Sequence, residues 1–171
     1  MCLGNYSHTS AADSERQIAI GYNVIGNGND TFTFGYGSSD TSCVLGGTTW
    51  STPSDIRLKE DIEDEKVGLD FINELRPVTY RWKKEKDIPK DLRAHGEGTE
   101  KRVMNGKYNH GFIAQEVKEV LDKNPDIKEG FDMWTEDEID GRQRIGETAL
   151  IPLLVKAVQE LSAEVNALKA K

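Results

Sequence analysis

The chain has 171 residues, of which 36% are hydrophobic, and a formal net charge of -8 at pH 7. This length fits one medium domain or two small ones. So negative a charge argues against nonspecific binding to nucleic acid or to an anionic membrane, because both need a basic surface. No apolar run approaches the roughly 18 residues of a spanning helix, and Cys2 and Cys43 have no metal-ligand spacing. We expect no nucleic-acid or membrane partner, no metal and no cofactor.

The charged residues are distributed unevenly along the chain. Residues 1–50 hold only five of them, whereas 47 of the 121 residues that follow are charged. The same first stretch carries 8 of the 16 glycines. The change in composition predicts two domains, at residues 1–53 and 54–171.

Residues 17–50 consist of short β-branched or aromatic alternations separated by glycine, at 18–21, 23–26, 31–35 and 43–46. Strands this short suit a solenoid or intertwined β-helix, in which they stack as rungs and glycine supplies corners with positive φ. Four rungs cannot bury a core alone. We therefore expect residues 1–53 to be the end of a β-stalk that continues upstream or winds with identical chains. The alternative is a flexible linker, which rarely keeps such regular alternation.

The C-terminal segment has a heptad pattern, with apolar residues spaced alternately by three and four positions at Ile151, Leu154, Val158, Leu161, Val165 and Leu168. We call these six residues the seam. A seam of this kind faces another helix. Pro152 fits only in a first turn, so the helix is predicted over about 148–171. An amphipathic helix packed on its own domain is the alternative, and the seam residues by themselves favour a parallel dimer.

The middle of the chain has an α+β pattern. A short helix is predicted at 67–75, a strand at 78–82, a polar arm at 88–107 and an amphipathic helix at 111–121. Its aromatic residues are interpreted as the core of a small domain: Tyr80, Trp82, Phe112, Phe131 and Trp134.

The junction between the two compositions contains Ser54 and Lys59. A serine hydroxyl becomes a nucleophile when a base takes its proton, and a lysine can be that base once burial leaves it uncharged. Five positions put the two side chains on opposite faces of a strand, or about 140° apart on a helix. A Ser-Lys dyad therefore requires a bend between them. The alternative is that Ser54 caps a helix and Lys59 is a solvated charge.

Four motifs occur in order along the chain: SDIRLKEDI (54–62), LRPVTYRW (75–82), GFIAQEV (111–117) and LIPLLVKAVQEL (150–161). Together they resemble the peptidase S74 family. Its members are C-terminal intramolecular chaperones of phage tailspikes, tail fibres and neck appendages, with relatives in endosialidases and the myelin regulatory factor. The resemblance implies an α+β chaperone domain that ends in a long helix in a trimeric coiled coil, preceded by the end of an all-β triple β-helix stalk.

The resemblance also implies a mechanism. The domain forms a homotrimer, registers the upstream β-helical part of its own precursor for winding, and then cuts itself off. Ser54 would be the nucleophile and Lys59 the general base, with Asp55 orienting the turn. Cleavage would fall at Pro53-Ser54 through an N-to-O acyl shift, or at Ser54-Asp55 by a serine of another chain. Gln115 either supports the site or is a structural amide.

The resemblance places these events in the host cytoplasm during virus assembly, after which the stalk stays on the virion and the chaperone is released. A trimer is expected in spite of the seam residues, because a triple β-helix sets the stoichiometry. Two alternatives are a trimerisation module that never cuts and a receptor-binding fibre tip in which the arm is the ligand surface.

Overall fold

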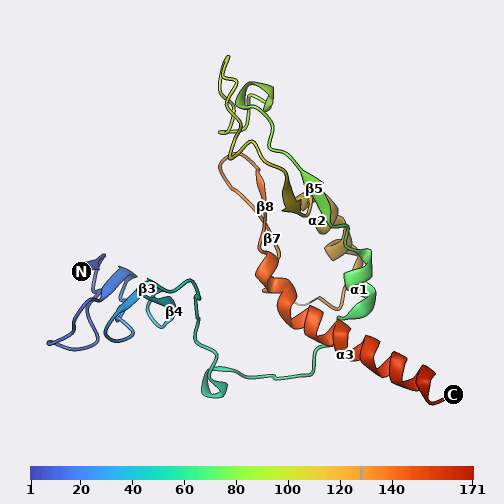
Figure 1. Cartoon of the computed structure of the whole chain (residues 1–171). Coiled ribbons are helices and arrows are strands. Elements are labelled where there is room, and N and C mark those ends of the chain that lie inside the picture. The colour runs from blue at the N-terminus through green and yellow to red at the C-terminus, as the bar shows by residue number, and fades with distance from the viewer. Residues whose placement is uncertain (128) are drawn as a thin grey trace. The chain divides into compact units, whose positions relative to one another are not determined.

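The structure is a computed structural model that describes residues 1–127 and 129–171 (Figure 1). The chain is mixed α/β. It divides into two compact units, residues 1–62 and 63–171.

The first unit is a four-stranded sheet of order β1-β2-β3-β4, formed by β1 (Cys2–Leu3), β2 (Ile18–Tyr22), β3 (Thr31–Tyr36) and β4 (Ser39–Val44). The first three strands run parallel, with Cys2 opposite Ala19 and Ile18 opposite Phe32. A further parallel bridge joins His8 to Ile25. The first three strands therefore lie side by side in parallel.

Two of the predicted rungs differ from the observed strands. Segment 43–46 is not a fourth parallel rung, because β4 turns back and runs antiparallel to β3. A two-residue turn that includes Gly37, at φ +57°, makes this hairpin. Segment 23–26 adds only the Ile25 bridge, and β1 was not predicted.

Gly4, Gly21 and Gly35 allow the strands to approach closely. All three have positive φ. A Cβ added at Gly4 would lie 1.9 Å from the carbonyl oxygen of Gly21, and one added at Gly21 would lie 2.0 Å from that of Gly35. No side chain fits at these positions without moving the backbone, which explains the repeated glycine.

The described part of the second unit contains three helices and two small antiparallel sheets. The helices are α1 (Leu69–Glu74), α2 (Ala114–Lys123) and α3 (Leu150–Lys169). Strand β5 (Val78–Tyr80) pairs with β6 (Asn109–Gly111), and β7 (Trp134–Glu136) pairs with β8 (Gln143–Ile145). The core consists of Phe71, Leu75, Val117, Val120, Met133, Leu150 and Leu153.

The predicted elements of the second unit are present with changed bounds, and one hairpin was missed. The helix predicted from 111 begins at Ala114, because residues 109–111 pair with β5. Strands β7 and β8 were not predicted. Of the five aromatic residues assigned to the core, Phe112, Phe131 and Trp134 pack against it. Tyr80 and Trp82 instead contact each other edge to face, with ring centroids 5.3 Å apart.

Helix α3 follows the 3₁₀ turn η3 (Glu147–Ala149), and Pro152 lies in its first turn as predicted. Its Leu150, Leu153 and Ala157 are buried, and the helix packs on α1. The Glu160 carboxylate accepts a hydrogen bond of 2.8 Å from the backbone N–H of Leu69, at the start of α1. Helix α3 is therefore an integral part of the second unit.

The predicted arm projects beyond the β7–β8 hairpin (Figure 1). It begins after the 3₁₀ turn η2 (Glu85–Asp87) and is closed at its base by a bridge between Lys84 and Arg102. The Arg93 guanidinium pairs at 3.2 Å with both Asp137 and Asp140 of the hairpin loop. These ion pairs attach the arm to the hairpin.

Candidate functional site

Ser54 and Lys59 are in direct contact. The Lys59 Nζ donates a hydrogen bond of 2.7 Å to the Ser54 Oγ. The bend between them is the 3₁₀ turn η1 (Ile56–Leu58). It is closed by hydrogen bonds from the N–H of Leu58 to the Asp55 carbonyl (3.0 Å) and from the N–H of Lys59 to that of Ile56 (3.2 Å).

Asp55, rather than Ser54, is the N-cap of this turn. Its Oδ1 accepts a hydrogen bond of 2.9 Å from the backbone N–H of Arg57. The alternative in which Ser54 is the cap is therefore wrong. The physical reason is that a side chain two positions before an N–H reaches it with the geometry of an Asx turn, and Asp55 stands at that distance from Arg57.

The Arg57 side chain also binds Asp55. Its Nε and Nη2 donate to the two carboxylate oxygens at 3.0 Å and 2.6 Å. The guanidinium, and after it the backbone N–H of Arg57, lower the pKa of the Asp55 carboxyl below its usual range. Sequence reasoning missed Arg57. The signal in the sequence was an acidic residue directly after Ser54 with an arginine two positions further on, a spacing that allows an ion pair across one turn.

Both members of the Ser-Lys pair are exposed in the single chain. In the observed contact the lysine donates the hydrogen bond, and a general base requires the reverse, an uncharged amine that takes the hydroxyl proton. Burial favours the uncharged amine. The single chain therefore holds the two groups in contact without burying them.

The other predicted residues take no part in the Ser-Lys hydrogen bond. Pro53 and Asp55 flank Ser54 and are exposed. Gln115 is an exposed residue of α2 in the second unit, and its role in the site stays a prediction. All six seam residues of α3 are exposed, from 40% for Val165 to 67% for Leu168.

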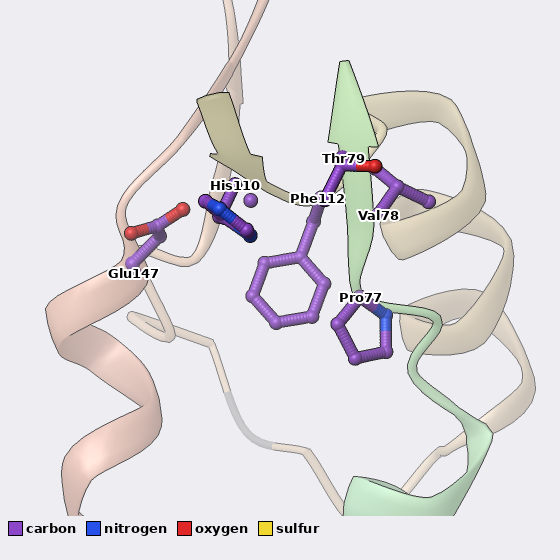
Figure 2. A pocket seen from close by; sticks show the side chains of 7 residues that line it. Pro77, Val78, Thr79, His110, Phe112 and Glu147 are labelled. Atoms are coloured by element: carbon purple, nitrogen blue, oxygen red, sulfur yellow. The ribbon is translucent and has the colours of Figure 1, made fainter. Parts of the chain in front are cut away.

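The second unit has an open groove of about 450 Å³ beside the β5–β6 sheet, lined by Pro77, Val78, Thr79, His110, Gly111, Phe112 and Glu147. Figure 2 shows the Phe112 ring between the Pro77 ring on one side and the His110 and Glu147 side chains on the other. One exposed imidazole and one exposed carboxylate on an apolar floor form no recognisable catalytic set. Among the described residues no cluster of His, Cys, Asp or Glu is arranged to hold a metal ion.

Comparison with protein families gives a match over residues 54–124 to the model of Peptidase_S74, described as chaperone of endosialidase. Residues 54–124 are therefore similar to Peptidase_S74. The match confirms the resemblance drawn from the motifs and supports a chaperone role. The matched segment contains Ser54, Lys59 and the motifs at 75–82 and 111–117, whereas the motif in α3 follows it.

No curated protein and no solved structure matches the chain. Within the described ranges, no helix is both long enough and apolar enough to cross a membrane.

Proposed function

We propose that this chain is an intramolecular chaperone that trimerises through α3, registers upstream β-strands for winding into a triple β-helix of a phage fibre or appendage, and then cuts itself at Ser54. The observation that carries the cleavage is the 2.7 Å contact between Lys59 Nζ and Ser54 Oγ. The family match supports the chaperone role.

The contact suits an N-to-O acyl shift. Uncharged Lys59 takes the Ser54 hydroxyl proton while Oγ attacks the carbonyl carbon of Pro53. The bond between the Pro53 carbon and the Ser54 nitrogen breaks, and that nitrogen receives the proton. Water then hydrolyses the ester, which leaves a carboxylate on Pro53 and a free hydroxyl and amine on Ser54. A cut between Ser54 and Asp55 would instead need a serine from a second chain.

Helix α3 supports the trimer. Its Leu150, Leu153 and Ala157 are buried within the second unit, while the seam is exposed on the same helix. When one apolar face of a helix is buried in its own domain and a second apolar face is exposed to water, the second face can bind a partner helix. Identical seams brought together form a short coiled coil.

A trimer at one end of the stalk would assist folding by holding the three chains together while their strands pair. Strands from three chains pair through non-local contacts, which form slowly and leave edges free to meet the wrong partner. Tethering the three ends raises the local chain concentration to roughly millimolar. Trimerisation would also supply the burial that the exposed Ser-Lys pair lacks, so that cutting waits for assembly.

Mass spectrometry and denaturing electrophoresis of the freshly expressed chain test the proposal. We expect a C-terminal fragment that begins at Ser54 or Asp55 in wild type and no fragment in Ser54→Ala or Lys59→Ala. The matched controls are Ser38→Ala and Lys66→Ala, which change exposed residues outside the contact and should be cut normally. A single uncut band in wild type after trimers have formed would refute self-cleavage.

The exposure of Ser54 and Lys59 favours one second candidate, a trimerisation module that does not cut. It predicts trimers from both wild type and Ser54→Ala with no fragment from either, as measured by light scattering and electrophoresis.

A further inference from the structure

Arg57 and Asp55 form a closed pair beside the Ser-Lys contact. The backbone N–H of Arg57 and its Nε both donate to Oδ1, and Nη2 donates to Oδ2. One residue thus occupies both oxygens of the carboxylate that directly follows Ser54. The planar fork of arginine allows this two-oxygen contact, which the single ammonium of lysine cannot reproduce.

The turn that carries this pair has no support from a core. None of the residues of η1 is buried, and Ile56 and Leu58 are 73% and 69% exposed. A single 3₁₀ turn in water is marginal without side-chain support. The Asp55 cap and its ion pair with Arg57 therefore supply the side-chain contacts that support the two backbone hydrogen bonds of the bend. The bend in turn sets the distance between Lys59 and Ser54.

The same ion pair gives the Asp55 carboxylate a partner other than the lysine. Left free, that carboxylate would be an alternative partner for the Lys59 ammonium. Arg57 neutralises that carboxylate and holds it. Lys59 is then left to contact the Ser54 hydroxyl.

Building on the proposed function, we infer that Arg57 is a positioning residue for self-cleavage. Through Asp55 it fixes the turn that places Lys59 Nζ on Ser54 Oγ, and it keeps the Asp55 carboxylate from competing for the lysine.

The test measures the rate of self-cleavage of the full chain against pH, with trimer content followed by light scattering. We expect Arg57→Gln to cut roughly 10- to 100-fold more slowly than wild type, as a misplaced base would. Its pH profile should also differ from that of wild type, because the Asp55 carboxylate, paired with Arg57 in wild type, is then an unpaired charge. Glu60 and Asp61, the charged residues that follow Lys59, stay the same in every variant.

A double variant separates positioning from a general loss of structure. In Asp55→Asn with Arg57→Gln the Asn side chain still caps the turn but carries no charge to attract Lys59. Its pH profile should return to the wild-type position, with a rate above that of Arg57→Gln alone. Arg16→Gln is the matched control, since Arg16 pairs with Asp30 elsewhere in the first unit, and it should cut at the wild-type rate.

The outcomes distinguish this inference from the proposed function. If wild type cuts and Arg57→Gln cuts at the same rate with the same pH profile, the role of Arg57 is refuted and self-cleavage stands. If wild type does not cut, both fail. Should Arg57→Gln not trimerise, Arg57→Lys replaces it, because it keeps the charge and loses the fork. If trimers of Arg57→Lys cut at the wild-type rate, the positioning role is overturned.

Discussion

Substituting alanine for Gly21 tests whether the strands of the first unit approach as closely as the structure shows. In Gly21→Ala the new Cβ would lie 2.0 Å from the Gly35 carbonyl oxygen, at φ +139°. We expect a loss on the order of 3 kcal/mol or more in local stability, since backbone must move. Amide hydrogen exchange of β2 and β3 would report it as faster exchange. Gly37→Ala has positive φ but open space and should cost about 1 kcal/mol. Equal exchange in the two variants would contradict the close approach.

The Glu160 carboxylate on α3 accepts a hydrogen bond from the start of α1, and the strength of that bond depends on the ionisation of Glu160. The backbone N–H of Leu69, and less strongly the Lys156 ammonium, lower the pKa of its carboxyl. A lowered folded-state pKa adds stability above the ordinary glutamate pKa of about 4.3, and this stability is lost as pH falls through the folded value. Wild type should therefore resist urea better than Glu160→Gln at neutral pH, and the difference should shrink under acid. Glu164→Gln, on the same helix, is the control, and a difference that does not change with pH would count against this role.

At the scale of the element, α3 has two apolar faces with different expected functions. Leu153 is 4% exposed, whereas Leu161 on the seam is 49% exposed. Leu153→Ala should lower the free energy of unfolding by about 2–5 kcal/mol, because it leaves a cavity in the core. Leu161→Glu should leave the folded second unit intact and dissociate the trimer, because it places charge in the seam. Urea unfolding and light scattering measure the two effects, and a trimer that persists in Leu161→Glu would argue against the seam.

At the scale of the whole molecule, assembly and cleavage should be coupled. Ser54 and Lys59 are exposed in the single chain, and in the proposed function neighbouring chains supply the burial. The half-time of cleavage should lengthen on dilution below the concentration at which trimers dissociate. Leu161→Glu, which retains both residues, should not cut. A half-time that stays constant across the dilution series would show that one chain cuts alone.

Periodicity and motif order were enough to predict much of this protein. The three-four spacing from Ile151 to Leu168 predicted the C-terminal helix, and Pro152 predicted where it begins, because both depend on contacts within a few residues along one helix. The order of the four motifs, the first of which begins at Ser54, predicted the family match. The need for a bend between Ser54 and Lys59 also followed from the sequence, because five positions suit neither a straight strand nor a helix.

Only the tertiary structure decided which partners those residues have. The pairing of β6 with β5 and the burial of Met133 depend on segments far apart in the chain, which leave no local periodicity. The return of β4 onto β3 depends instead on the two-residue turn at Gly37. The choice of Asp55 over Ser54 as the cap, and the closure of Arg57 on Asp55, depended on the φ and ψ angles of one short turn. Residue spacing predicted that Ser54 and Lys59 need a bend, and the folded turn determined which side chains hold it.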